Sequence, residues 1–211
     1  MIVVVAHTKG GVGKSTLAVN MVVVRSRTGR DVLLVDADEQ GTATDFTTLR
    51  SEQLGEPGYT AVSLSGASVR TQVLQLSSKY EDIIIDAGGR DTAGLRAALT
   101  VCDVALVPFQ PRSFDLWTLE KMVALMSEAQ EYRQSPLRAV AILNFLDPTG
   151  RDNIVAAEVL TGNQMIGYLH TPIGRRKAFP NAAAEGRAVC ELKPQDPKAT
   201  AEIAALVHAV F

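Results

Sequence analysis

The feature that most constrains this chain is the segment Lys9-Gly-Gly-Val-Gly-Lys-Ser-Thr16, which follows the apolar run Ile2–Ala6 and precedes a helical stretch. Glycines allow the backbone to curl so that successive N–H groups point at phosphate oxygens. The N-terminus of the following helix adds partial positive charge. A glycine-rich loop between a strand and a helix therefore predicts a phosphate-binding loop, and the alternative is a glycine-rich turn without a ligand.

The loop residues have distinct expected contacts. We expect Lys14 to contact the β- and γ-phosphates, the Ser15 hydroxyl to bind Mg²⁺, and Thr16 to reach the α-phosphate. The usual pattern has glycine where this chain has Thr8, and Lys9 is an additional lysine at the start of the loop. The phosphate-binding residues predicted from this segment are Gly10, Gly11, Val12, Gly13, Lys14, Ser15 and Thr16.

Short apolar runs alternate with helical stretches along the chain, which is typical of an α/β, doubly wound fold with a mostly parallel sheet and helices on both faces. The predicted strands are Ile2–Ala6, Val32–Val35, Ala61–Leu64, Asp82–Ile85, Val104–Pro108, Ala139–Asn144 and Met165–Leu169. The predicted helices are Lys14–Thr28, Thr42–Leu49, Ser68–Tyr80, Thr92–Val101, Phe114–Arg133, Ile154–Leu160, Arg175–Ala184 and Ala199–Val210. The segment Ser51–Thr60 is expected to be a surface loop.

Length and charge exclude several classes of protein. The 211 residues fit one domain, 1–211, that can bury a core without disulfides or structural metal. With 21 basic and 23 acidic residues the net charge is -2, so constitutive binding of nucleic acid by bulk charge is excluded, although a local or switched basic patch is not. The two cysteines, Cys102 and Cys190, lack metal-ligand spacing and are expected to be reduced thiols in a cytoplasmic protein. No segment approaches 18 consecutive apolar residues, so no membrane span is expected.

Two acidic motifs end predicted strands. Asp36 and Asp38 lie in Val35-Asp-Ala-Asp-Glu-Gln-Gly41, and Asp86 ends the apolar run Ile83–Ile85 before Ala87-Gly-Gly89. Phosphoryl transfer needs charge neutralisation and a positioned water, which carboxylates at strand ends can supply with Mg²⁺. The alternative for the first motif is that its acidic residues cap the helix Thr42–Leu49.

These three motifs resemble those of the ParA/MinD superfamily of deviant-Walker P-loop ATPases, which has the P-loop NTPase fold. The resemblance implies that Lys9 reaches across a dimer interface to the partner's nucleotide. It also implies that Asp38 orients the attacking water while Ser15, Asp36 and Asp86 serve the magnesium. Catalytic roles thus fall on Lys9, Lys14 and Asp38. Gly89 is expected to place its N–H near the γ-phosphate.

The resemblance also indicates where adenine binds. Asn144, at the end of a predicted strand, matches a polar position that contacts adenine in the family, although a capping role in the following turn is the alternative. Pro172 falls where the family has a loop near the base. This chain departs from the family pattern at two places. It has Glu39 where the family usually has proline, and it lacks the proline that the family often has after the residue matching Asp86.

A basic cluster near the C-terminus is the expected DNA-binding surface. Six Lys or Arg and three Asp or Glu occur between His170 and Thr200, and such a surplus can bind phosphates nonspecifically. ParA-type proteins bind DNA as ATP dimers through this region, so the resemblance assigns DNA binding to Arg175, Arg176, Lys177 and Arg187. An ordinary solvated helix face is the alternative. The segment after Lys198 has no Lys or Arg, so we expect it to pack against the core and not to bind a membrane.

The sequence therefore predicts a small ParA-type partition ATPase without an N-terminal DNA-binding domain. It would hydrolyse ATP weakly, bind Mg²⁺, and form an ATP-dependent homodimer on nonspecific DNA. A small centromere-binding adaptor would stimulate hydrolysis, and the ATP-bound protein would associate with the nucleoid. The alternatives are a MinD-like positioning ATPase that acts on a protein cargo without DNA, and a metabolic ATP-dependent enzyme.

Overall fold

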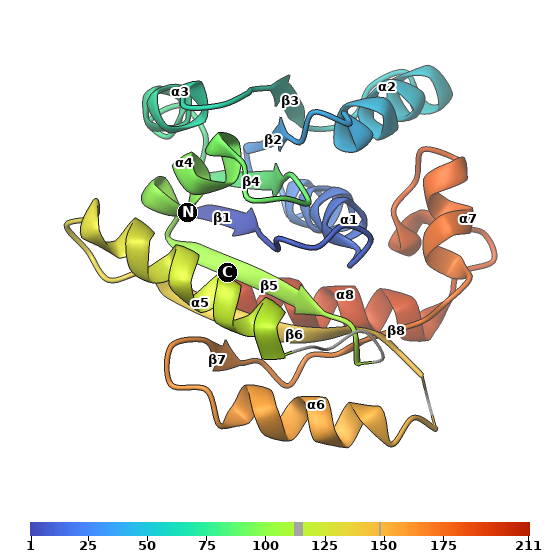
Figure 1. Cartoon of the computed structure of the whole chain (residues 1–211). Coiled ribbons are helices and arrows are strands. Elements are labelled where there is room, and N and C mark those ends of the chain that lie inside the picture. The colour runs from blue at the N-terminus through green and yellow to red at the C-terminus, as the bar shows by residue number, and fades with distance from the viewer. Residues whose placement is uncertain (112–115, 148) are drawn as a thin grey trace.

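The computed structural model describes residues 1–111, 116–147 and 149–211, and it contains a parallel sheet with helices on both faces (Figure 1). The strand order is β3-β2-β4-β1-β5-β6-β7, and β8 also pairs with β6. This confirms the predicted α/β fold. The strands are β1 Ile2–Val5, β2 Val32–Ala37, β3 Thr60–Ser63, β4 Asp82–Ala87, β5 Val104–Phe109, β6 Arg138–Leu146, β7 Gly167–Tyr168 and β8 Ile173–Gly174.

The helices separate successive strands for most of the chain. They are α1 Lys14–Ser26, α2 Thr42–Leu54, α3 Ser68–Leu76, α4 Ala93–Val101, α5 Leu116–Glu131, α6 Asp152–Thr161, α7 Ala178–Ala184 and α8 Pro197–Val210, with the 3₁₀ turn η2 Val189–Glu191 before α8. The predicted helix Phe114–Arg133 is confirmed over α5, and its first residues, 114 and 115, lie outside the described residues.

Two apolar cores lie on opposite faces of the sheet. Side chains of α3, α4, α5 and α6 pack against one face, with Leu99 and Met122 fully buried. Side chains of α1, α2, α7 and α8 pack against the other face, with Leu17 and Leu206 among them. The four central strands β1, β2, β4 and β5 are buried throughout, which explains why their sequences are apolar without alternation.

The register of the central strands brings the three sequence motifs to one edge. Asp36 of β2 pairs with Asp86 of β4, and Val5 at the end of β1 pairs with Asp86 on its other side. Because these strands are parallel, the loops that follow them leave from the same carboxyl edge of the sheet. Ligands of open α/β folds bind in the crevice outside this edge.

Two predicted boundaries differ most from the structure. Helix α2 continues to Leu54, so only the second half of the segment Ser51–Thr60 is the expected loop. Helix α7 begins at Ala178 and not at Arg175, because Gly174 still belongs to strand β8 and the Arg175 N–H donates to the Leu146 carbonyl. Strand β8 is only two residues long and carries no periodic signal.

The C-terminal helix α8 packs against the core, as predicted, and it contacts α1 there. Ile203, Leu206, Val207 and Val210 of α8 are buried, and the guanidinium of Arg25 on α1 lies 4.6 Å from the centroid of the Phe211 ring. Among the described residues, no helix combines the length and apolar character needed to cross a membrane. Both cysteines are free thiols, and burial raises the pKa of Cys102 to about 12.

Candidate nucleotide-binding site

A cavity of about 730 Å³ lies at the carboxyl edge of the sheet, where the loops after β1, β2 and β4 meet. The glycine-rich loop lines it with Gly10, Gly11, Gly13, Lys14, Ser15 and Thr16. The loops after β2 and β4 contribute Asp38 and Gly89 from the predicted site. The structure therefore brings residues of all three motifs around one cavity, although they are up to 79 positions apart in the sequence.

The loop has the glycine-dependent shape that its sequence predicts. Gly11 and Gly13 have φ values of 74° and 91°, which side chains other than glycine rarely adopt. Gly13 also packs directly on strand β6, since a Cβ atom there would lie 2.3 Å from the Asn144 Nδ2 atom. Helix α1 starts immediately afterwards, with the Leu17 N–H donating to the Gly13 carbonyl at 3.0 Å. The N-terminus of α1 thus points at the cavity, where it favours an anion.

The two lysines of the loop are placed differently. Lys14 is buried, lines the cavity, and its Nζ donates to the Lys9 carbonyl at 3.4 Å. Burial lowers the pKa of Lys14, and the carboxylates of Asp86 and Asp38 oppose that effect. Lys9, by contrast, is exposed and is not among the residues that line the cavity. Lys14 can therefore contact a phosphate inside its own cavity, whereas the Lys9 side chain lies outside it.

Asp86 is a buried carboxylate without a hydrogen-bond partner among the described residues. The pKa of Asp86 is raised to about 7, mainly by burial and also by the carboxylates of Asp36 and Asp38. The nearby Ser15 hydroxyl and Lys14 ammonium oppose this rise. A buried acid with two unsatisfied oxygens is costly unless a proton or a cation occupies the site. The combination of Asp86 with the Ser15 hydroxyl therefore fits a hydrated Mg²⁺ ion.

Asp36 has an additional role within the protein. Its Oδ2 accepts hydrogen bonds of 2.8 Å from both the backbone N–H and the hydroxyl of Thr44, and its Oδ1 accepts from the Asp38 N–H at 3.1 Å. The carboxylate thus holds the start of α2, which is the helix-capping role considered as an alternative from the sequence. Its place in a magnesium shell stays a prediction.

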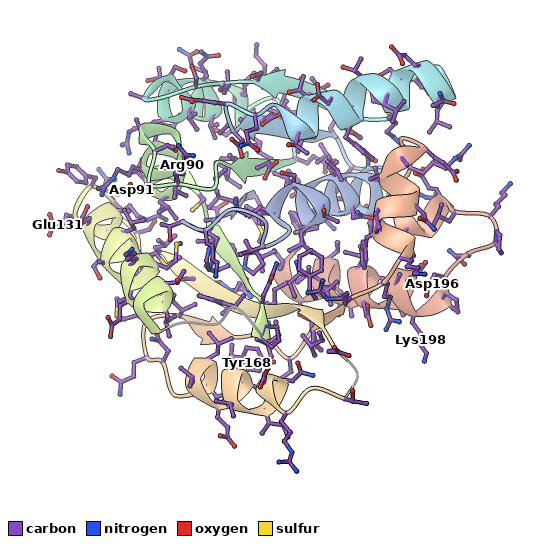
Figure 2. The ribbon with its side chains drawn as sticks, turned by 45° about the vertical axis from the view of Figure 1, so that its right-hand side comes forward. Arg90, Asp91, Glu131, Tyr168, Asp196 and Lys198 are labelled. Atoms are coloured by element: carbon purple, nitrogen blue, oxygen red, sulfur yellow. The ribbon has the colours of Figure 1, made fainter. Side chains whose placement is uncertain are left out.

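Asp38 and Gly89 both line the cavity. The Oδ1 of Asp38 accepts from the Gln40 N–H at 3.1 Å and would be 3.6 Å from a Cβ on Gly88. A Cβ on Gly89 would lie 3.0 Å from the Gly10 Cα and 3.3 Å from the Lys14 Nζ. Glycine therefore allows the loop after β4 to approach the glycine-rich loop closely. Figure 2 shows Arg90 and Asp91 beside each other where this loop leads into α4.

The described carboxylates, histidines and cysteines form no cluster of three or more that could hold a metal by themselves. This arrangement agrees with the chemistry of Mg²⁺, which takes one or two carboxylates and fills its remaining positions with water and phosphate oxygens. Bound Mg²⁺ would neutralise charge on the terminal phosphates. A metal site here is expected only together with a nucleotide.

The predicted adenine contacts lie beside the cavity. Asn144 is 2% exposed, and its Nδ2 donates to the Val12 carbonyl at 2.8 Å. Neither Asn144 nor Pro172 lines the cavity, so their contact with adenine stays a prediction. Sequence reasoning missed Phe145, which does line the cavity and has the unusual φ of 59°. Its only sequence signal is its position directly after Asn144 at a strand end.

The predicted DNA-binding residues do not form one free patch. Arg176 is tied to Glu202, with its Nε 2.9 Å from the carboxylate, and the guanidinium of Arg175 lies 5.4 Å from the centroid of the Phe145 ring. Lys177 is exposed at the start of α7. Arg187 lines a different cavity, beyond α7 in the chain. The basic cluster therefore divides into two places on the surface.

Comparisons with known proteins agree with this architecture. Residues 3–189 match the family described as "CobQ/CobB/MinD/ParA nucleotide binding domain". The chain is 28% identical over 210 residues to the maintenance of carboxysome distribution protein A of Halothiobacillus neapolitanus, covering 98% of this chain and 94% of that protein. It is also 28% identical to the chromosome-partitioning ATPase Soj of Thermus thermophilus, over 67% of each chain.

A solved structure with the same fold contains a nucleotide. It is a putative plasmid partition protein from Borrelia burgdorferi bound to AMPPNP, with a TM-score of 0.76 and 19% identity. The match covers 99% of this chain and 98% of the other. At this identity the likeness establishes the fold alone.

Proposed function

The chain belongs to the CobQ/CobB/MinD/ParA family of nucleotide-binding domains, and from this premise we propose that it is an ATP-dependent DNA-partition ATPase. In this proposal ATP binding closes two subunits into a dimer, the dimer holds nonspecific DNA, and hydrolysis releases it. Relatives named for chromosome partitioning and for carboxysome distribution make it, at the coarser level, a ParA-family partition or positioning ATPase.

The contrast between Lys9 and Lys14 carries the proposal. Both lysines belong to one loop and are five positions apart in the sequence, yet only Lys14 is buried at the cavity. The phosphates of one nucleotide in that cavity would be bound by Lys14 and by the backbone N–H groups of the loop. In this proposal the exposed Lys9 side chain contacts a nucleotide held by a second copy of this chain, so that the site would be complete only in a dimer.

The remaining residues divide the work of hydrolysis in this proposal. Ser15 and Asp86 would hold Mg²⁺, which supplies charge neutralisation at the terminal phosphates. Asp38 lines the cavity and would orient the attacking water. We expect basal hydrolysis to be slow and to depend on an adaptor protein.

The dimer is tested by sedimentation of the Asp38→Ala variant with ATP and with ADP. We expect a doubled mass with ATP alone, because this variant stalls hydrolysis and preserves the ATP state. Adding Lys9→Ala should keep ATP binding and abolish the doubling, whereas Lys14→Ala should weaken ATP binding itself. Lys79→Ala, at an exposed lysine elsewhere, is the matched control. A monomer in ATP for the Asp38→Ala protein contradicts the proposal.

A second candidate function is the positioning of a protein cargo. It is favoured by the match to the carboxysome distribution protein, which covers nearly the whole chain. DNA binding in ATP against ADP, measured over a range of salt concentrations, separates the two candidates. An ATP-dependent dimer that binds no DNA favours cargo positioning without DNA, and salt-dependent DNA binding in ATP favours partition.

A further inference from the structure

A second cavity, of about 470 Å³, lies between the end of α1 and the segment 187–195. Three of its lining side chains, Arg27, Arg187 and Lys193, are cationic, and Glu191 is the one carboxylate among its described lining residues. We refer to this cavity as the basic pocket. It shares no lining residue with the nucleotide cavity.

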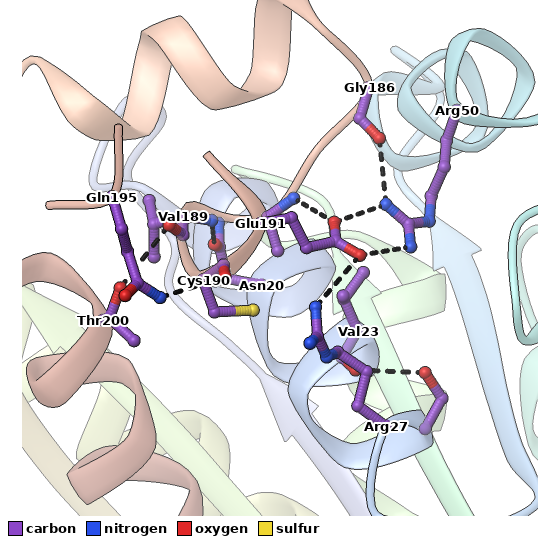
Figure 3. Close-up of polar contacts among 12 residues, drawn as sticks. Asn20, Val23, Arg27, Arg50, Gly186, Val189, Cys190, Glu191, Gln195 and Thr200 are labelled. Carbon is purple, nitrogen blue, oxygen red and sulfur yellow. Dashed lines mark hydrogen bonds and ion pairs between the residues drawn. The ribbon is translucent and has the colours of Figure 1, made fainter. Parts of the chain in front are cut away.

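Glu191, the one carboxylate among the described lining residues of the basic pocket, is paired with Arg50, which does not line the pocket (Figure 3). Arg50 of α2 is buried, and its two terminal nitrogens donate to the two oxygens of Glu191 at 2.7 and 2.9 Å. The Ala188 N–H donates to the same carboxylate at 2.9 Å. Burial of Glu191 acts to raise its pKa, but these donors together with Arg27 hold the pKa below its ordinary value. Glu191 therefore stays ionised and fully engaged.

The cations of the pocket are not neutralised to the same degree. Arg27 lies 3.6 Å from Glu191, and Arg187 lies 3.6 Å from the exposed Glu185, so both are ion pairs beyond hydrogen-bond length. No carboxylate among the described residues pairs with Lys193. Three cationic side chains thus line the basic pocket. Its one carboxylate among the described lining residues, Glu191, is paired with the buried Arg50.

The backbone that carries these cations is held in place. Arg50 also donates to the Gly186 carbonyl at 3.1 Å and to the Pro57 carbonyl at 2.7 Å. Gly186 has φ of 62°, and a Cβ there would lie 2.7 Å from the Arg50 Cα. The start of the segment 187–195 is therefore packed onto α2, so that Arg187 projects from a fixed position. A preorganised cationic site loses less entropy on binding an anion.

We propose that the basic pocket binds a phosphate of the DNA backbone, with Arg27, Arg187 and Lys193 as its contacts. A phosphodiester presents oxygens that suit arginine forks and a lysine point charge. The inference rests on the proposed DNA-binding function and changes its location. Arg176 of the predicted patch is occupied by Glu202, whereas the basic pocket keeps its surplus positive charge. A chain of net charge -2 needs such a local surplus to hold DNA.

The test measures binding of the intact protein to nonspecific duplex DNA in ATP, as a function of salt, for wild type and for Arg187→Gln/Lys193→Gln. Each phosphate contact contributes about 0.9 to the slope of log affinity against log salt. Two pockets in a dimer should therefore lower that slope by about 2 and reduce affinity on the order of 10-fold or more at 0.1 M salt. Lys79→Gln/Lys121→Gln, at two exposed lysines elsewhere, is the charge-matched control, and ATP-dependent sedimentation reports that the variants still fold and dimerise.

Three results overturn the inference in distinguishable ways. If the double variant keeps the wild-type slope, the DNA contact lies elsewhere and the proposed function stands. If wild type dimerises in ATP but binds no DNA, the DNA part of the proposed function fails and this site assignment fails with it. If inorganic phosphate at constant ionic strength shifts the NMR signals of the pocket while the double variant binds DNA normally, the pocket takes free phosphate and not the DNA backbone.

Discussion

The side-chain amide of Asn144 donates a 2.8 Å hydrogen bond to the backbone carbonyl of Val12, so strand β6 holds the phosphate-binding loop from its outer side. The Oδ1 of the same amide accepts from the Phe145 N–H at 3.0 Å. Because Asn144 is buried, these bonds have no competition from water. The shape of the loop thus depends on a residue 132 positions away in the sequence.

Asn144→Ala should lower the free energy of unfolding by about 1–3 kcal/mol, because it leaves the buried Val12 carbonyl without its donor. It should also weaken nucleotide binding, since the loop loses its support. Urea unfolding measures the first effect, and titration with ATP measures the second. A variant with wild-type stability contradicts this structural role for Asn144.

The same variant tests the predicted contact between Asn144 and adenine. If Asn144 acts only by holding the loop, the variant should bind ATP and inorganic triphosphate more weakly by the same factor. If it also contacts adenine, ATP should lose more affinity than triphosphate does. Equal affinity of variant and wild type for triphosphate, with a loss for ATP, would leave adenine as its main contact.

Gly13→Ala should destabilise the protein even without nucleotide. Alanine at φ of 91° is strained, and its Cβ would lie 2.3 Å from the Asn144 Nδ2. We expect a cost of about 2–3 kcal/mol, which corresponds to roughly 5–10 °C in Tm for a chain of this size. Gly10→Ala is the matched control, because a Cβ at Gly10 meets no atom within 4 Å. Thermal unfolding of the nucleotide-free variants should separate the two, and equal Tm values would contradict the steric argument.

The sequence predicted the fold class and the main loop because both depend on local patterns. Apolar runs such as Asp82–Ile85 read as buried strands, and the glycines and lysines of the loop have few alternative uses. The helix through Val22 and Val23 formed despite the strand preference of valine, since its apolar face packs against the sheet and α8.

The contacts between distant segments could not be predicted from local pattern. Nothing in the sequence near Asp36 shows that Thr44 occupies one of its oxygens, and nothing near Arg176 shows that Glu202 engages it. Arg187 of the basic pocket was assigned to DNA binding from the sequence, but Arg27 and Lys193 were missed for the same reason. Arg27 directly follows α1 and Lys193 lies more than 160 residues later, so the packing of α8 and η2 onto α1 brings them together.

The stability of the nucleotide-free protein should fall as pH rises from about 4 to about 7, as far as Asp86 contributes. Its folded pKa is about 7 and its ordinary value is 3.8, so in this window the folded state binds a proton that the unfolded state has released. The stabilisation that the protonated Asp86 contributes is lost as the pH rises through about 7. A difference of about 3 pH units corresponds to roughly 4 kcal/mol.

The contribution of Asp86 is isolated with Asp86→Asn, which replaces the carboxyl group by a neutral one of the same shape. Urea unfolding at several pH values should show a variant that is more stable than wild type at pH 8 and similar to it at pH 4–5. The difference between the two proteins is the measured quantity, because other groups titrate equally in both. A difference that stays constant with pH contradicts the raised pKa.

Removing the buried partner of Glu191 should cost far more than removing an exposed one. Arg50→Gln leaves the largely buried Glu191 without its bidentate donor and should lower the free energy of unfolding by about 3–5 kcal/mol. Arg96→Gln breaks only the exposed pairs with Asp91 and Glu128 and should cost much less, because exposed ion pairs contribute little to stability. Urea unfolding at neutral pH compares the two variants. Equal costs would mean that Arg50 does not anchor the segment 186–191, and the fixed geometry of the basic pocket would then lose its support.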